Sequence, residues 1–136
     1  MDPLQSIAKI AAGGMTAQTA RLRIISENVA NADSTGTSAG ADPFRRKTIS
    51  FSELVDRDNG ASMVEVDRIG RDQSGFKLVF DPSHPAADAE GIVKRPNVDP
   101  IIEMANMREA SRSYEANMNM FEAGRRMRGQ MIDLLK

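Results

Sequence analysis

The feature that most constrains the fold is a stripe of apolar residues at helical spacing near each end of the chain. Between residues 3 and 32, positions alternately four and three apart are apolar or small, with one polar member: Leu4, Ala8, Ala11, Met15, Gln18, Leu22, Ile25, Val29 and Ala32. This spacing puts all nine on one side of an α-helix and is typical of helices that pair. Pro3 suits a first turn, whose N–H has no partner within the helix.

Residues 99–136 predict a second long helix, with Asp99 as its N-cap and Pro100 in its first turn. Its broad apolar face contains Ile101, Met104, Met107, Tyr114, Met118, Phe121, Met131 and Leu135. Six of the nine methionines fall in this segment. Methionine side chains adapt to neighbours of different shape, so the face suits contacts with several partners.

The middle of the chain, residues 34–98, has a different composition. It holds six of the ten glycines and four of the six prolines. Residues 63–69 and 76–80 have strand-like composition and are separated by the turn-rich residues 70–75, which predicts a β-hairpin between them. Residues 45–51 are a candidate further strand, and residues 81–91 predict a proline-punctuated loop.

We therefore predict an α+β fold. Two long terminal α-helices, within residues 1–33 and 99–136, pair as an antiparallel coiled coil, and residues 34–98 form a small insert that contains a β-hairpin. Two helices enclose no core by themselves, and the insert is too short to cover both, so we expect other chains to cover the remaining apolar surface. An ordinary helical hairpin that folds as a monomer is the alternative.

The composition excludes several classes of protein. The net charge of −1 does not indicate a protein that binds nucleic acid. The absence of cysteine excludes disulfides and thiol chemistry. No apolar run is long enough for a membrane span. The first residues lack the features of a cleaved secretory signal. If the protein leaves the cytoplasm, we expect a route without signal cleavage.

The candidate sites for chemistry are weak. His84 is the only histidine, stands in a loop and has no matched nucleophile or base, so we predict a solvated or hydrogen-bonded side chain. Residues 56–60, DRDNG, fail the calcium-loop pattern because the glycine arrives one position early. We predict no enzyme activity, cofactor, metal or small-molecule substrate. Residues 44–47, FRRK, form the densest basic cluster. They are a solvated strand end or a contact to a neighbouring subunit's carboxylates. A nucleic-acid contact is a third option, which the neutral surrounding charge disfavours.

Several motifs together resemble the flagellar rod and hook axial proteins. SENVANADSTGT (26–37) is similar to their N-terminal signature, and DPFRRKTISF (42–51) follows it. DPSHPAADAEG (81–91), PNVD (96–99) and SRSYEAN (111–117) resemble the later part of a proximal rod subunit. Phe44 and Ile92 stand where tyrosines are usual. The signature positions are Asn28, Asn31, Gly36, Phe44, Arg45, Arg46, Asp81, Pro82, Pro85, Pro96, Asn97, Ser113, Tyr114 and Asn117.

The resemblance implies a structural subunit of the basal-body rod, exported by the flagellar type III apparatus and placed in the periplasm. It also implies neighbours such as FliE, FlgB, FlgF and further copies of the same chain. Another axial subunit, FlgB-like or from the distal rod, is the nearest alternative, and a helical export chaperone or adaptor is a more distant one.

Two expectations about individual residues follow. The subunit interface should include Leu4, Met15, Leu22, Ile25, Val29, Met107, Tyr114, Met118, Phe121, Met131 and Leu135. Asn28 and Asn31 lie in the last turn of the first helix, where amides are poor helix formers. We expect both to hydrogen-bond adjoining segments, with local capping as the alternative.

Overall fold

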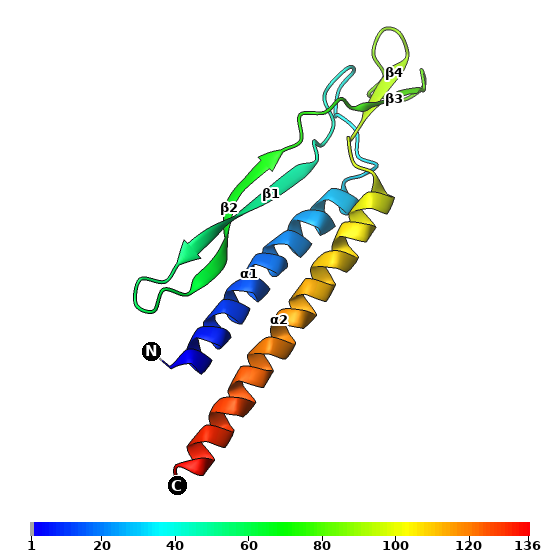
Figure 1. The fold of residues 1–136 in the computed structure, drawn as a ribbon. Helices are drawn as coiled ribbons and strands as arrows, with labels where there is room; N and C mark the ends of the chain where they lie inside the picture. Colours follow the sequence, from blue (N-terminus) through cyan, green and yellow to red (C-terminus); the bar gives the residue numbers. More distant parts are fainter. Residues whose placement is uncertain (1) are drawn as a thin grey trace. The chain divides into compact units, whose positions relative to one another are not determined.

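The computed structural model describes residues 2–136 and contains two helices and four strands. These are α1 (Pro3–Ala30), β1 (Lys47–Val55), β2 (Ser62–Arg71), β3 (Lys77–Phe80), β4 (Ile92–Arg95) and α2 (Pro100–Leu134) (Figure 1). The chain forms two compact units. The first contains Met1–Leu22, Ile49–Arg68 and Arg108–Lys136, and the second contains Arg23–Thr48 and Ile69–Met107. The predicted α+β class is confirmed.

Both helices begin after an aspartate cap, of which Asp99 was predicted and Asp2 was not. The Asp2 carboxylate accepts a hydrogen bond of 3.0 Å from the backbone N–H of Leu4, and the Asp99 carboxylate accepts one of the same length from Ile101. Each aspartate thus satisfies an N–H that lacks a partner within its helix, and each is followed by proline at the first helical position. Neither α1 nor α2, over the part of the chain that the structure describes, is apolar enough to cross a membrane.

In the first unit, α1 and α2 pair in antiparallel fashion. Contacts join the helices at four levels: Asp2 with Arg128, Ile7 with Gly124, Gly14 with Asn117, and Arg21 with Glu109. Nineteen residues separate the first and last of these levels on both helices, so the register is continuous. A Cβ atom placed on Gly14 would lie 2.6 Å from the Asn117 side chain. Glycine is therefore what allows the helices to approach at this level.

The β1–β2 hairpin of the first unit lies against α1 (Figure 1). Lys9 forms a 3.2 Å ion pair with Asp56, Asn59 donates a hydrogen bond of 3.1 Å to the Ser6 hydroxyl, and a Cβ placed on Gly13 would lie 3.4 Å from the Val64 carbonyl oxygen. We expected the insert to be too short to cover both helices. Because the β1–β2 hairpin lies against α1, the insert does cover part of one of them.

The predicted pairing of residues 63–69 with residues 76–80 is wrong. Strand β2 pairs with β1, whereas β3 pairs antiparallel with β4 in the register Lys77↔Arg95 to Phe80↔Ile92. The turn between β1 and β2 lies in the rejected DRDNG sequence, where Gly60 has a φ of +72° and Asn59 accepts a hydrogen bond from the Ala61 N–H. That sequence supplies the left-handed glycine and side-chain acceptor of a tight turn.

In the second unit, the predicted loop of residues 81–91 connects β3 to β4. The Asp88 carboxylate closes this loop by accepting hydrogen bonds of 2.9 Å from the backbone N–H groups of Glu90 and Ile92. Ala86, Val93 and Val98 are buried, and so are Ile24 and Ile25 of α1. These buried apolar side chains belong to the second unit.

Candidate assembly site

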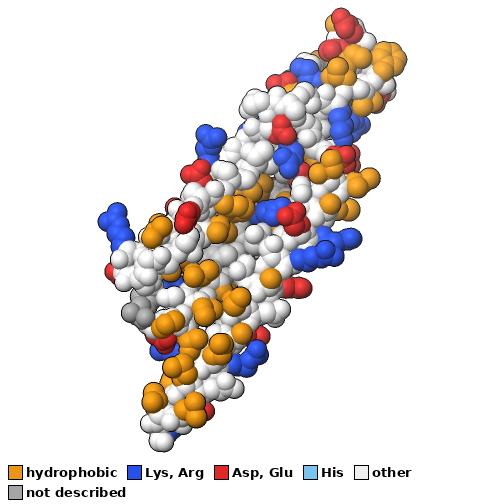
Figure 2. Space-filling model, viewed as in Figure 1, with side chains coloured by type: hydrophobic (Ala, Val, Ile, Leu, Met, Phe, Trp, Pro, Cys, Tyr) orange, Lys and Arg blue, Asp and Glu red, His pale blue; other side chains and the backbone are white. Residues whose placement is uncertain are grey.

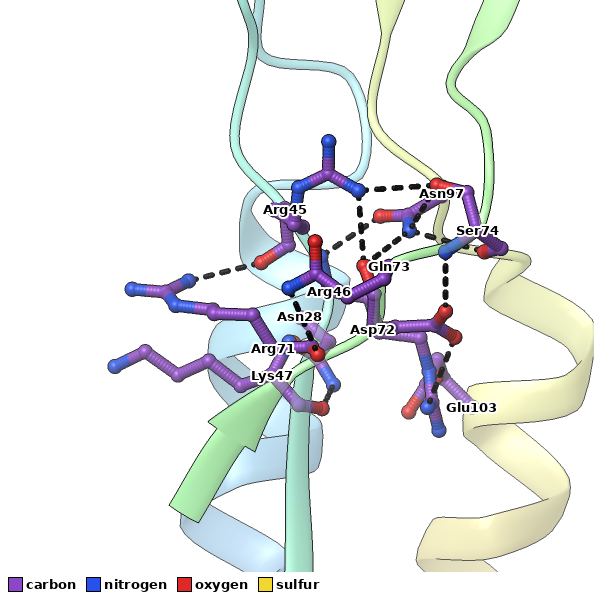
Figure 3. A network of polar contacts seen from close by, with 10 residues as sticks. All are labelled: Asn28, Arg45, Arg46, Lys47, Arg71, Asp72, Gln73, Ser74, Asn97 and Glu103. Atoms are coloured by element: carbon purple, nitrogen blue, oxygen red, sulfur yellow. Dashed lines mark hydrogen bonds and ion pairs between the residues drawn. The ribbon is translucent and has the colours of Figure 1, made fainter.

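Asn28, in the last turn of α1, holds the start of β1. Its Nδ2 donates a 2.9 Å hydrogen bond to the Lys47 carbonyl oxygen, and its Oδ1 accepts a 2.8 Å bond from the Lys47 N–H (Figure 3). The Asn28 side chain thus pairs with a peptide group as a neighbouring strand would. The Asn28 side chain is only 1% exposed, and its amide satisfies both backbone groups of Lys47, which are partly buried. The prediction for Asn28 is confirmed.

Asn31 has a different role. Its Nδ2 donates a 2.8 Å hydrogen bond to the Glu27 carbonyl oxygen, four residues earlier in the same helix, and its own carbonyl accepts a bond from the Ser34 hydroxyl. These are local end-of-helix contacts, so the expectation that Asn31 reaches an adjoining segment is wrong. Gly36 follows, and a Cβ there would lie 2.6 Å from the Ala41 carbonyl oxygen. The close approach of two backbone segments therefore requires glycine at this position.

Asn97 joins the segment before α2 to the segments that flank the β1–β2 hairpin. Its Oδ1 accepts a 2.8 Å hydrogen bond from the Arg46 N–H, and its Nδ2 donates to the Asp72 and Ser74 carbonyl oxygens at 3.0 and 3.2 Å (Figure 3). The Arg45 guanidinium donates to the same two carbonyls, each at 3.0 Å. We call Asn28, Arg45, Arg46, Lys47, Asp72, Ser74, Asn97 and Glu103 the clasp.

The clasp contains a buried charge on α2. Glu103 is 0% exposed and its Oε1 pairs with the Arg46 guanidinium, which also lies 3.7 Å from the Asp72 carboxylate. Without Arg46, a carboxylate would be buried with no compensating cation, at a cost of several kcal/mol. Hydrogen bonds from the Ser74 N–H and hydroxyl, and the nearby arginines, hold the pKa of Asp72 below its usual 3.8.

Every residue of the FRRK sequence has a partner within the chain. The Arg71 guanidinium lies over the Phe44 ring, at 5.3 Å from its centroid, and Arg45 lies over the Phe76 ring at 4.2 Å. The Lys47 ammonium pairs with Glu27 and lowers the pKa of that carboxyl. The interpretation of residues 44–47 as a solvated strand end is therefore wrong. The carboxylates that these residues contact in the structure belong to the same chain.

The other polar candidates are structural. His84 Nδ1 accepts a 2.9 Å hydrogen bond from the Ala86 N–H and so stabilises the loop after β3, in agreement with the prediction of a hydrogen-bonded histidine. Within residues 2–136 no three His, Asp or Glu side chains are grouped so that they could hold a metal ion.

The large apolar side chains that are exposed lie on α2, on α1 and on strands β1, β2 and β3, and about half of them belong to α2 or directly follow it. Those of α2 and of the residue after it are Ile101, Ile102, Met104, Met118, Met120, Met127, Met131, Ile132, Leu134 and Leu135, with Ile101 79% and Leu135 85% exposed. Figure 2 shows hydrophobic side chains gathered over the C-terminal part of this helix. Arg128 is level with Asp2, so the residues of α2 that follow extend past the start of α1. Because successive residues of a helix are about 100° apart, these ten side chains lie on several sides of α2, and together we call them the α2 apolar face.

The residues predicted for the subunit interface occupy three environments. Ile25 is buried at 4% exposure, so its contacts lie within the chain. Met118, Met131 and Leu135 are exposed and belong to the α2 apolar face. The half-buried members are Leu4, Met15, Leu22, Val29, Met107, Tyr114 and Phe121.

Two flagellar families match the ends of the chain. The family described as "Flagella basal body rod protein" matches residues 9–36, and "Flagellar basal body rod FlgEFG protein C-terminal" matches residues 89–134. The chain is 51% identical over its whole length to "Flagellar basal-body rod protein FlgC" of Agrobacterium fabrum, covering 98% of that protein. The chain belongs to the FlgC family. It is also 35% identical to FlgC of Bacillus subtilis over 93% of the chain, and 40% identical to FlgC of Escherichia coli O6:H1 over 91%.

Membership in the FlgC family confirms the resemblance predicted from the signature motifs. The chain is a structural subunit of the flagellar basal-body rod and not an enzyme, and the alternatives of an FlgB-like subunit or an export chaperone are not favoured. A rod protein assembles with other rod components, so the α2 apolar face is the candidate assembly site. The clasp is an internal framework to which Asn28, Arg45, Arg46 and Asn97, all predicted as signature positions, contribute.

Proposed function

We propose that this FlgC-family chain polymerises through its terminal helices into the proximal part of the rod. The observation that supports the proposal is the α2 apolar face, which stays exposed although α1 already pairs with α2. Full burial of one Leu, Ile or Met side chain contributes about 1.5–3 kcal/mol. Ten such side chains therefore supply a driving force for association that the isolated subunit does not use.

In this proposal residues 1–33 and 99–136 form the axial part of the subunit and residues 34–98 form the outer insert. The axial helices enclose the export channel and transmit torque as part of the drive shaft. The neighbours are further FlgC copies, FliE, FlgB and FlgF. The half-buried interface residues Leu4, Met15, Leu22, Val29, Met107, Tyr114 and Phe121 complete their packing against these neighbours.

The location follows from the same proposal. The subunit passes through the flagellar type III apparatus without signal cleavage and assembles in the periplasmic space. Helix ends with little enclosed core do not offset their ordering entropy, about 1–2 kcal/mol per residue for the backbone, so they order fully only in the rod. Incomplete order before assembly also eases passage through a narrow channel.

The test is a charge placed on the α2 apolar face. Met131→Asp should prevent incorporation into rods and abolish swimming, because assembly would bury an unpaired carboxylate. Ser111→Asp adds the same charge at an exposed polar position of α2 and is the matched control, for which we expect assembled rods. Incorporation is read by immunoblot of isolated basal bodies. Normal swimming of the Met131→Asp strain would rule out this face as an interface.

A further inference from the structure

The β1–β2 hairpin of the first unit is acidic and partly apolar. Residues 49–68 contain five carboxylates and two arginines, a net charge of −3 in a chain whose total is −1: Glu53, Asp56, Asp58, Glu65 and Asp67, with Arg57 and Arg68. Asp56 is paired with Lys9. The same segment has the exposed apolar side chains Phe51, Leu54, Val55 and Val64, which are close in sequence to the remaining acidic residues. We call this surface the acidic hairpin.

The C-terminal end of α2, in the same unit, has the opposite charge. Residues 121–136 contain four basic and two acidic side chains, a net charge of +2: Arg125, Arg126, Arg128 and Lys136, with Glu122 and Asp133. Arg126 forms no ion pair within residues 2–136, and Glu122, Arg125 and Arg126 line a shallow hollow of about 370 Å³. Beside them lie Met127, Met131, Ile132, Leu134 and Leu135 of the apolar face. We call this segment the basic helix end.

The part of the hairpin around Val64 does not reach the basic helix end of its own chain. The Val64 carbonyl lies against Gly13, and the adjacent Gly14 is level with Asn117. Met131 is fourteen residues further along α2, which corresponds to about 21 Å at 1.5 Å per residue. The part of the acidic hairpin around Val64 and the part of α2 that follows Arg128 are therefore left for contacts with other molecules.

We propose that the acidic hairpin of one subunit docks on the basic helix end of a second copy of this chain. The occupant is a second copy because opposite charges surround apolar side chains on both surfaces, and both surfaces belong to this chain. The two surfaces differ, so the contact is heterologous, and a pair of subunits keeps one free hairpin and one free helix end, as the growth of a rod requires. The proposal deepens the proposed rod assembly and rests on it.

Cysteine cross-linking tests which surfaces meet. The chain has no cysteine, so introduced thiols mark single positions. Val64→Cys and Met131→Cys are expressed together as two separate variants, and basal bodies isolated from those cells are oxidised. We expect a dimer whose linked peptides join residue 64 to residue 131, which a contact between identical surfaces does not produce. Val64→Cys expressed with Ser111→Cys is the control and should give no such link, because disulfides need Cα atoms within about 7 Å.

The outcomes separate this inference from the proposed function. Basal bodies that lack both variants would count against rod assembly itself and with it this contact. Basal bodies that contain both variants but no link between residues 64 and 131 would overturn only the docking of hairpin on helix end. A link from residue 64 to itself, or from residue 131 to itself, as the sole product would overturn it as well.

Charge reversal tests the electrostatic part of the same contact. Glu53→Lys with Glu65→Lys should reduce the number of assembled rods, and Arg125→Glu with Arg126→Glu should do the same. All four substitutions in one chain restore opposite charges between copies, so we expect rod assembly and swimming to recover. A quadruple variant that assembles no better than either double variant would contradict the pairing of these surfaces.

Discussion

At the scale of single residues, the clasp shows what a signature motif does and does not reveal. The motif pointed to Asn28, Asn31 and Asn97, but it did not distinguish their roles. Asn28 and Asn97 reach backbone groups 19 or more residues away, whereas Asn31 stays within its own helix. These partners come from the fold, because an amide in a helix end has the same local chemistry in both cases.

Asn28 can be tested against Asn31. Asn28→Ala should lower the free energy of unfolding by about 1–3 kcal/mol, because the partly buried N–H and C=O of Lys47 both lose their partner. Asn31→Ala removes one local bond near the helix end and should cost less than about 1 kcal/mol. Urea denaturation of the purified chain measures both values. Equal losses for the two variants would contradict the role assigned to Asn28.

Glu103, like Asp72 and Ser74, is a clasp residue that was not predicted from the sequence. It stands at the start of a stripe with alternating spacings of four and three that continues through Met107, Ala110, Tyr114 and Asn117. A carboxylate at such a position predicts either exposure or a buried cationic partner. The FRRK arginines were the available partners, and the pattern of α2 could have suggested the pair.

At the scale of elements, helices were predicted better than strand pairing. The stripes placed α1 and α2 within two residues of their observed ends, because caps and periodicity are local properties. The pairing predicted for β2 and β3 was wrong because residues 70–75 have the composition of a hairpin turn. Asp72 and Ser74 of that segment instead supply backbone carbonyls to Arg45 and Asn97, a demand from distant residues that composition does not reveal.

The close approach of α1 and α2 at Gly14 gives a prediction for the helix pair. Gly14→Leu should destabilise the chain by about 1–3 kcal/mol, because its side chain would occupy the space of Asn117. Gly129→Leu is the control: nothing lies within 4 Å of a Cβ at that position, and leucine is a better helix former than glycine. Thermal denaturation followed by circular dichroism should show a lower Tm for Gly14→Leu alone. An unchanged Tm would mean that the helices separate at this level without cost.

At the scale of the whole molecule, burial is unevenly distributed along the chain. The clasp encloses Asn28 and Glu103 completely, whereas the end of α2 has Leu134 84% exposed. The apolar stripes of the sequence predict surface that other chains cover, and the α2 apolar face is part of the apolar surface that is exposed in the single chain. Which neighbour covers each part of it depends on the geometry of the rod, and a single sequence does not contain that information.

This uneven burial predicts a gradient of amide hydrogen exchange in the free subunit. The Arg46 and Lys47 amides donate to the Asn97 and Asn28 side chains within the clasp and should exchange slowly. Amides of residues 129–134 belong to a part of α2 that extends past the start of α1, and they should exchange quickly because the helix end is held only by its own hydrogen bonds.

In assembled rods, exchange at residues 129–134 should become slow while the Arg46 and Lys47 amides stay slow and serve as the internal reference. Mass spectrometry of peptides from the free chain and from isolated basal bodies measures the difference. Assembly that buries the α2 apolar face must protect these amides, since a packed helix end opens far less often than a free one. Equal protection of residues 129–134 in both states would mean that α2 is already fully ordered before assembly, and coupled folding of this helix end would then be wrong.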